Sequence, residues 1–476
     1  MGAVAGPDSS RSGASKRPLT VEDITVTEPG VIRRAIGAAA IGNVTEWYDF
    51  GVYAYFEDTI RQVFFSGLPK NIGTIATLGL FAVAFLVRPF GGLFFGPLAD
   101  RIGRNKVLST TMILMALGTF CIGVIPSYHS IGVIAPLLVL LARLVQGFST
   151  GGEYGNAMTF IAEYAPDKRR GFLGSWLEFG TLTGYVMGAV IVTVITSVMP
   201  EPTLLSWGWR IPFFVALPLG IVGLYLRLRL EDTPAYLKLA EQADAREKEQ
   251  KASTEFRDIL KLWPAMLVCG GLVLVWNVTN YMLTSYMPTY VTGKATGGGV
   301  SDTTSQILQI VVLAVLMVVV TFLGRLSDRI GRRPIIFTAS VALIVLSIPS
   351  ILLIRAGSAT SIFFGLLIMG LMLVCFSATM PSTLPALFPT KVRAGALSIA
   401  FNIAVSLFGG TTSVVTASLI SATGDLNWPG YYLIIAGAIG AVAIYLTKES
   451  ARKPLAGSSP AAGTKEEARE IVETAR

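Results

Sequence analysis

Ionisable side chains stand inside segments that are otherwise apolar enough to cross a membrane. Glu46 and Asp49 are three residues apart, so a helix places both on one face together with Tyr53. Each charge inside a span raises the free energy of membrane insertion by on the order of 2.5 to 3.5 kcal/mol, so such residues are candidates for a functional role. The further charges of this kind are Arg88, Arg143, Glu153 and Glu178. Together these residues predict a polar cavity between helices.

The acids in this set could bind and release a coupling proton. Burial raises the pKa of a carboxyl group and a nearby arginine lowers it. The proton affinity of such a group can therefore change as the site opens in turn to the two sides of the membrane. We expect this role of Glu46, Asp49 and Glu178, facing Arg88 or Arg143. The alternative interpretation is a set of permanent ion pairs that hold helices together, and it is strongest for Glu153.

The elements that must position these residues are membrane-spanning helices. Of the 476 residues, 52% are hydrophobic and 14% are charged, and a water-soluble chain could not bury that much apolar surface. Two charge-free runs, residues 107–125 and 335–354, are each long enough as helices to cross about 30 Å of hydrocarbon. We place spans near 34–56, 74–98, 106–126, 132–157, 171–198, 207–228, 262–290, 303–324, 334–355, 358–384, 394–421 and 428–447.

The formal charge of +8 reports orientation and does not indicate a nucleic-acid partner. With both ends cytoplasmic, most of the 38 basic residues lie inside, which is the positive-inside bias. The expected exceptions are Arg61, Lys70, Arg210, Lys294 and Arg355 outside, and Arg88 and Arg143 within the membrane. The expected organisation is a cytoplasmic N-terminal segment at 1–33, a six-helix half at 34–228, a charged cytoplasmic linker at 229–261, a second half at 262–447 and a cytoplasmic tail at 448–476.

An internal repeat supports the two halves. The eleven residues 96–106 match residues 324–334 at seven positions, and Pro166-x-x-x-Arg170 recurs at nearly the same offset as Pro389-x-x-x-Arg393. Two matches at one offset indicate duplication, which is the architecture of a parallel-repeat transporter.

Each repeated Gly-x-Leu-x-Asp-Arg-x-Gly-Arg segment is a tight turn between two spans. Gly96 and Gly103 allow close approach or unusual backbone angles, and Asp100 can pair with arginines such as Arg101, Arg104 or Arg170. Such a charge network could latch one side of the protein shut and break when the halves rock. The gating set that we predict is Asp100, Arg101, Arg104, Arg170, Asp328, Arg329, Arg332 and Arg393. The alternative is a static turn with topogenic charges.

These turns, with Arg143-Leu-Val-Gln-Gly147, resemble the signature motifs of the major facilitator superfamily. Residues 42–51, 88–93, 151–154 and 207–213 are similar to its metabolite:proton symporter family, and 174–180 and 277–282 to the proline/betaine:proton symporters within it. The similarity runs from about residue 18 to 460. It implies an all-α polytopic membrane protein with twelve transmembrane helices in two six-helix halves, the major facilitator fold.

One departure concerns the C-terminus. Some proline/betaine symporters continue into a long cytoplasmic coiled coil tied to osmotic sensing, whereas here residues 465–472 leave little more than one heptad. That is too short for a stable coiled coil alone, so osmotic activation by this route is not expected.

The resemblance implies a symporter that imports a zwitterionic compatible solute, such as proline or glycine betaine, with protons. Aromatic side chains on spans 1 and 7 could attract the cationic nitrogen of such a solute, and a polar stripe on span 7 could line the cavity. The expected substrate-binding set is Trp47, Phe50, Tyr53, Arg88, Arg143, Trp276, Asn277, Asn280 and Tyr281, with Tyr48 and Thr284 beside it. Packing is the alternative role for any single aromatic residue.

Other functions remain open at this point. In an organic-acid symporter for 2-oxoglutarate, citrate or shikimate, Arg88 and Arg143 would bind carboxylates directly. A non-transporting membrane sensor is a remote alternative. The sequence lacks a P-loop and metal-ligand histidines, so we expect no enzyme, no metal and no cofactor besides the coupling proton. The expected partners are a small-molecule substrate, protons and the lipid bilayer of the cell inner membrane, without nucleic acid or an obligatory protein partner.

Overall fold

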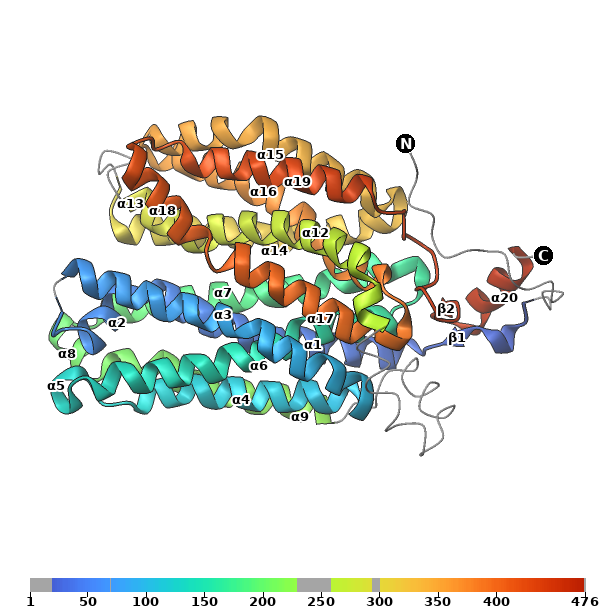
Figure 1. The fold of residues 1–476 in the computed structure, drawn as a ribbon, viewed down its shortest axis with the longest axis horizontal. Coiled ribbons are helices and arrows are strands. Elements are labelled where there is room, and N and C mark those ends of the chain that lie inside the picture. Colours follow the sequence, from blue (N-terminus) through green and yellow to red (C-terminus); the bar gives the residue numbers. More distant parts are fainter. Residues whose placement is uncertain (1–18, 69, 229–257, 293–299, 475–476) are drawn as a thin grey trace.

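Two bundles of long helices lie side by side with their axes along the same direction (Figure 1). The computed structural model describes residues 19–68, 70–228, 258–292 and 300–474. The first bundle comprises the helices before residue 229, and the second comprises those after residue 262. The predicted linker at 229–261 lies almost wholly outside the described residues.

The first half contains six long helices among its described residues, joined by short ones. They are α1 (Pro29–Tyr55), α3 (Lys70–Ile102), α4 (Arg104–Val124), α6 (Ile134–Tyr164), α7 (Arg170–Val198) and α9 (Ile211–Leu228). The short helices are α2 (Glu57–Phe64), α5 (Tyr128–Ile131), η2 (Asp167–Arg169), α8 (Glu201–Ser206) and η3 (Gly208–Arg210).

The second half repeats this plan, but two of its spans are interrupted. Its helices are α12 (Trp263–Tyr281), η4 (Met282–Tyr286), α13 (Met287–Thr292), α14 (Asp302–Ile330), α15 (Arg332–Arg355), α16 (Ala359–Thr383), η6 (Pro385–Leu387), η7 (Thr390–Val392), α17 (Arg393–Ala404), η8 (Val405–Gly409), α18 (Thr412–Thr423) and α19 (Trp428–Tyr445). The elements η4 and η8 are single π-helical turns, which are often found at functional sites. The spans expected near 262–290 and 394–421 correspond to the apolar helical stretches Trp263–Tyr286 and Thr390–Thr423, and the π-helical turn in each was not predicted.

Within the described residues, eleven helices are long and apolar enough to cross a membrane. Helix α1 is not among the eleven, although its 27 residues are sufficient for a span. Its polar residues, which include Asn43, Glu46 and Asp49, lower its hydropathy. With α1, the bundle has the twelve helices that the sequence predicted.

Helix α1 approaches α7 closely because α7 presents glycine at every fourth position. A Cβ atom on Gly184 would lie 2.5 Å from the carbonyl oxygen of Val44, and one on Gly188 would lie 2.8 Å from the amide nitrogen of Val52. Small residues at this spacing allow helix backbones to approach in a membrane. Asn43 of α1 thereby comes within hydrogen-bond distance of Thr181 on α7, at 2.5 Å.

The duplicated turns adopt the same backbone conformation. Gly103, between α3 and α4, has φ of 107°, and Gly331, between α14 and α15, has φ of 100°. Side-chain-bearing residues avoid this region, which explains the repeated glycine. Gly96 also fulfils its expected role, because a Cβ there would meet Gly395 Cα at 3.2 Å.

The segments near the two termini pack together at one end of the bundle (Figure 1). Strand β1 (Thr25–Val26), which follows the short helix η1 (Val21–Asp23), pairs in parallel with β2 (Ala461–Ala462). Helix α20 (Lys465–Thr474) covers this pair through Ala468 and Val472, which are buried with Ile24. The tail is thus a short helix docked on the N-terminal segment.

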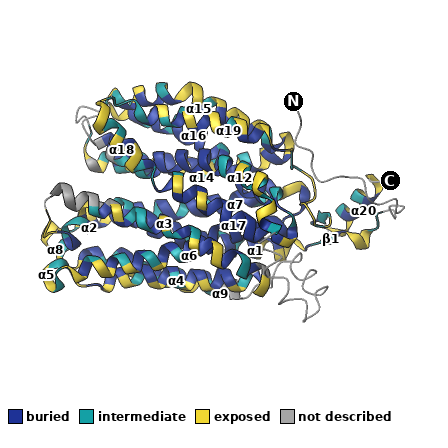
Figure 2. Ribbon diagram, in the orientation of Figure 1, coloured by how far each residue is buried: buried dark blue, intermediate teal, exposed yellow. Residues whose placement is uncertain are grey.

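Exposed residues gather on the outer faces of the bundles, and buried ones line the space between them (Figure 2). Large apolar side chains such as Phe322 and Leu267 are among the exposed residues. Residues at the seam between the halves are buried instead. There α7 packs on α14 and α16, and α3 packs on α17. Outward apolar and inward polar surfaces are what a lipid environment requires.

Candidate functional site

Asp49 on α1 is held by two side chains of α6. Arg143 Nη1 donates to Asp49 Oδ2 at 2.9 Å, and Gln146 Nε2 donates to Oδ1 at 3.2 Å. Both charged side chains are fully buried. Removing one partner of such a buried pair typically costs about 3 to 5 kcal/mol, so this contact fixes α1 against α6.

Arg143 is also covered by an aromatic ring of α1. Its guanidinium carbon lies 3.8 Å from the centroid of the Tyr53 ring, which is a cation–π contact. The Tyr53 hydroxyl donates to the carbonyl oxygen of Thr77 on α3 at 3.1 Å. The predicted substrate ligands Tyr53 and Arg143 are therefore engaged with each other and with Asp49.

Arg88 on α3 is held more loosely. Its Nη2 lies 4.0 Å from Glu46 Oε1, and its guanidinium carbon lies 4.3 Å and 4.9 Å from the ring centroids of Phe85 and Phe50. Within the described residues, its Nε and Nη2 atoms make no hydrogen bond. Arg88 therefore has donor capacity that a substrate carboxylate could use.

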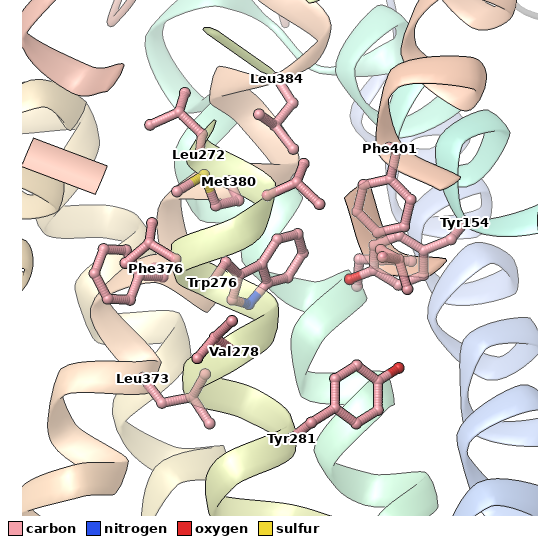
Figure 3. Close-up of a cluster of buried hydrophobic side chains, with 14 of the residues drawn as sticks. Tyr154, Leu272, Trp276, Val278, Tyr281, Leu373, Phe376, Met380, Leu384 and Phe401 are labelled. Atoms are coloured by element: carbon pink, nitrogen blue, oxygen red, sulfur yellow. The ribbon is translucent and has the colours of Figure 1, made fainter. Parts of the chain in front are cut away.

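Aromatic rings from both halves meet beside this arginine. Trp47 lies 5.2 Å from Tyr185, 6.1 Å from Tyr154 and 6.4 Å from Tyr281, measured between ring centroids. Tyr154 in turn stacks on Phe401 of α17 at 5.1 Å. Figure 3 shows Trp276 and Tyr281, both of α12, on one side of a region that Tyr154 and Phe401 face from other helices. Such a cluster can present ring faces to an organic cation.

Two glycines and a π-turn of the second half make room for Tyr281. A Cβ on Gly409, in η8, would lie 2.8 Å from Cε2 of the Tyr281 ring, and one on Gly410 would lie 2.6 Å from Phe85. Phe85 packs edge-on against Tyr281 at 5.1 Å. The interruption of the eleventh span thus shapes the aromatic cluster.

Glu178 on α7 differs from the other acids of the site. It is 3% exposed, it accepts a hydrogen bond from the Tyr154 hydroxyl, and Thr181 Oγ1 donates to it at 3.3 Å. Within the described part of the chain, it forms no ion pair with any lysine or arginine. Its environment is therefore neutral, whereas Glu46 and Asp49 face arginines.

The polar residues predicted on span 7 are buried, with exposures of 6% for Asn277 and 8% for Asn280. Asn277 Nδ2 donates to the carbonyl oxygen of Val273 at 3.0 Å, within its own helix. Thr284 reaches the other half, where its Oγ1 lies 3.5 Å from the Tyr185 hydroxyl. Trp276 Nε1 donates to Ser377 Oγ of α16 at 3.0 Å.

Several residues of this site were missing from the predicted set. Tyr154 had a signal, because it ends the Gly-Gly-Glu-Tyr motif that the sequence analysis singled out. Tyr185, Ser377, Phe401 and Asn402 lie in helices without any distinguishing pattern. Asn402 Nδ2 donates across the seam to the carbonyl oxygen of Gly151 at 2.7 Å, which only the tertiary structure reveals.

The predicted gating residues lie at the end of the bundle near the termini. Asp328 on α14 accepts hydrogen bonds from the backbone N–H groups of Gly171 at 2.7 Å and Phe172 at 2.8 Å. These belong to the first turn of α7, so the carboxylate caps a helix of the other half. Arg332 Nη2 lies 3.9 Å from the same carboxylate.

A second contact across the seam joins Arg393 of α17 to Glu163 of α6, with Nη1 and Oε1 2.8 Å apart and both side chains fully buried. Arg170 forms an ion pair with Asp167, three residues away in η2, and the expected pairing of Asp100 with Arg101, Arg104 or Arg170 stays a prediction. The side chains of Asp100 and Arg104 lie outside the described part of the structure. Arg101 and Arg329 are exposed.

Comparisons with known proteins agree with this architecture. A family model described as sugar (and other) transporter matches residues 35–455. The chain is 45% identical over 460 residues to a proline/betaine transporter of Escherichia coli (strain K12), covering 96% of this chain and 91% of the relative. It is 46% identical over 461 residues to the glycine betaine/proline/ectoine/pipecolic acid transporter OusA of Dickeya dadantii (strain 3937), again covering 96% and 91%.

Among solved structures, the chain is similar to the proton:xylose symporter XylE of the major facilitator superfamily bound to 6-bromo-6-deoxy-D-glucose. The TM-score is 0.71 at 18% sequence identity, covering 94% of this chain and 100% of that chain. This likeness supports the fold of two six-helix halves.

Proposed function

The chain belongs to the family of sugar and other transporters, and we propose that it is a symporter that imports a zwitterionic compatible solute such as proline or glycine betaine with protons. It is a multi-pass membrane transporter of the major facilitator fold and not an enzyme. We propose no cofactor besides the coupling proton.

The observation that carries the substrate proposal is the aromatic cluster beside Arg88. A zwitterion with a bulky cationic nitrogen needs ring faces for its cation and a donor for its carboxylate. Trp47, Tyr185 and Tyr281 offer the ring faces, and Arg88 offers its Nε and Nη2 atoms, which make no hydrogen bond within the described residues. Curated relatives with 45% and 46% identity are named as transporters of proline and betaines, which supports this substrate class.

The proton site is proposed among the three acids Glu46, Asp49 and Glu178. An alternating carrier needs a carboxyl group whose environment differs between its two states. Asp49 can exchange its contact with Arg143 for a proton, and Glu46 can do the same with Arg88. In Gln or Asn variants of the coupling acid, proton-driven uptake should collapse while substrate exchange survives.

We also propose that both termini and the 229–261 linker are cytoplasmic, in the cell inner membrane. The distribution of basic residues supports this orientation. Cysteine labelling from outside the cell should fail at a site introduced near Ala243 and succeed near Gly298, two positions outside the described residues. The reverse pattern would contradict the orientation.

A symporter for organic acids is the second candidate, because the nitrogens of Arg88 would serve a dicarboxylate equally well. Uptake of labelled glycine betaine by proteoliposomes under an inward proton gradient tests the choice. Unlabelled proline betaine should compete and 2-oxoglutarate should not. Competition by 2-oxoglutarate alone would replace the proposed substrate class with organic acids.

A further inference from the structure

Glu178 lies where side chains of both halves converge. On its own half it is bonded to Tyr154 of α6 and to Thr181 of α7. From the other half, Ser377 of α16 faces the same carboxyl group. The carboxyl group therefore lies between the two halves in the interior of the bundle.

Both tryptophans of the proposed substrate cluster connect to this carboxyl group. Trp47 Nε1 donates to Asn43 Oδ1 at 3.1 Å, and Asn43 Nδ2 donates to Thr181 Oγ1 at 2.5 Å, next to Glu178. From the second half, Trp276 Nε1 donates to Ser377 Oγ at 3.0 Å. The ring of Tyr154 lies against Trp47 and Trp276 at 6.1 Å and 5.9 Å. A solute held by these rings therefore orients the partners of Glu178.

The groups facing Glu178 from the neighbouring helices are neutral. Helix α6 presents the Tyr154 phenol, which is titratable, while α16 presents Ser377 and α1 presents Asn43 through Thr181. Four acids on the helices packed against α7 have other partners. Glu46 and Asp49 of α1 face arginines, Glu163 of α6 pairs with Arg393, and Asp328 of α14 caps the first turn of α7.

We propose that Glu178 is the acid at which proton uptake and substrate binding meet, and that it is protonated when the halves close around the solute. This inference rests on the proposed function as a proton symporter. An ionised carboxylate in a dry, neutral site carries a large free-energy penalty. When the halves part, Ser377 leaves, water reaches the carboxyl group and the ionised form is no longer penalised. Closure and protonation therefore favour each other by linkage.

Tyr154 and Ser377 are positioning residues in this scheme. A protonated carboxyl group can accept the Tyr154 hydroxyl proton on Oε1 and donate its own proton to Ser377 Oγ from Oε2, so one neutral acid satisfies partners in both halves. Tyr154 also donates to the ionised form, which it stabilises. Loss of its hydroxyl should therefore shift the pH midpoint of substrate binding to higher pH.

The test uses the full-length protein in proteoliposomes and in detergent. Glu178→Gln mimics the protonated acid, so glycine betaine counterflow should persist while accumulation under a proton gradient falls at least about ten-fold. Substrate affinity, titrated from about pH 5 to about pH 9, should become nearly independent of pH. Glu201→Gln is the matched control, because this exposed acid lies at the start of α8, and it should behave as wild type.

Two outcomes would overturn the inference. In one, Glu178→Gln retains gradient-driven accumulation and the wild-type pH dependence of affinity. In the other, the folded variant loses counterflow as well, which would place the carboxyl group in substrate binding alone. If the wild-type protein itself shows no gradient-driven accumulation, the proposed function fails first, and this result is distinct from both.

A second pair of variants keeps the test decisive if Glu178→Gln does not fold. Tyr154→Phe retains the ring that stacks on Phe401 and removes only the hydroxyl group. It should keep counterflow and shift the pH midpoint of affinity upward, whereas Ser377→Ala should shift it downward, because Ser377 accepts the proton of the neutral acid. Tyr431→Phe, at an exposed tyrosine of α19, is the control. Unchanged midpoints in both Tyr154→Phe and Ser377→Ala would contradict the proposal.

Discussion

The two ends of the seam between the halves are closed by different chemistry. Near the termini, the Arg393–Glu163 pair is fully buried and Asp328 caps the first turn of α7. At the opposite end, the described contacts are neutral. The Tyr55 hydroxyl donates to Gln309 Oε1 at 3.1 Å, and Thr193 Oγ1 donates to Gln306 Oε1 at 3.2 Å.

The difference predicts which end opens more easily from this conformation. A neutral hydrogen bond contributes about 0.5 to 1.5 kcal/mol net, and water replaces it when the seam opens. Separating a buried ion pair without hydration of both charges costs several kcal/mol. We therefore expect the end away from the termini to open first, and each prediction below tests one part of this contrast.

The largest effect is expected from the buried pair. Arg393→Met leaves the Glu163 carboxylate without that guanidinium group, which should destabilise the closed seam by about 3 to 5 kcal/mol. A cysteine introduced at the buried position Ser398 on α17, in a background without the native cysteines, should react faster with a maleimide added from the side of the termini. Uptake should fall in parallel.

The double variant Glu163→Gln with Arg393→Met is the control for this prediction, because it leaves no unpaired charge. It should restore much of the closed state and of the thermal stability. If Arg393→Met leaves both the labelling rate and the melting temperature unchanged, the ion pair does not hold this end shut.

A smaller effect is expected at the helix cap. Asp328→Asn retains the size of the side chain but loses the charge that faces the first turn of α7, at a cost of about 1 to 2 kcal/mol. Labelling at Ser398 should increase less than in Arg393→Met, and transport should be impaired in correctly inserted protein. Normal transport in Asp328→Asn, in Asp100→Asn and in the double variant would make the duplicated turns topological signals only.

Two residues of the charged end, Asp328 and Arg393, could be singled out from sequence, whereas their partners and the whole of the neutral end could not. Asp328 and Arg393 belong to duplicated motifs, whose glycine, aspartate and arginine spacing signals a turn. Tyr55, Gln306 and Gln309 belong to no motif, and their meeting depends on how α1 and α7 lie against α14. Likewise, the acids and arginines of the site stood out in apolar segments, whereas Ser377 and Phe401 did not.

The π-helical turns within two spans also escaped prediction, for a related reason. A π-turn adds one residue to a helical turn without a proline or a change of hydropathy to mark it. In η8 the glycine that accommodates Tyr281 is visible only in the packing of α12 against η8. The number and order of the helices follow from hydropathy, but their local distortions follow from tertiary contacts.

The next smaller effect is expected at the neutral end, where a variant should lower the labelling rate at Ser398 and not raise it. Tyr55→Phe removes the hydrogen bond to Gln309 and should weaken this end by about 0.5 to 1.5 kcal/mol. Sites on the side away from the termini should become more accessible, while the labelling rate at Ser398 should fall. An increase in the labelling rate at Ser398 would mean that Tyr55 does not help to close the neutral end of the seam.

The smallest effect is expected at the tail. Lys168 Nζ and Glu470 Oε2 are 3.0 Å apart, but both side chains are exposed, at 48% and 66%. Solvent-exposed pairs contribute about 0 to 1 kcal/mol, so Glu470→Gln should leave labelling at Ser398 within error of wild type. A change as large as that of Asp328→Asn would show that the tail, and not the buried pair, controls this end.

The proposed symport requires that solute movement is coupled to proton movement. Proteoliposomes that contain the purified protein and an external pH-sensitive dye, with equal pH on both sides, test this coupling without an imposed driving force. Addition of glycine betaine outside should make the external medium more alkaline as protons enter with the solute, and Glu178→Gln should abolish the signal. Entry of labelled glycine betaine without any change in external pH would contradict the account.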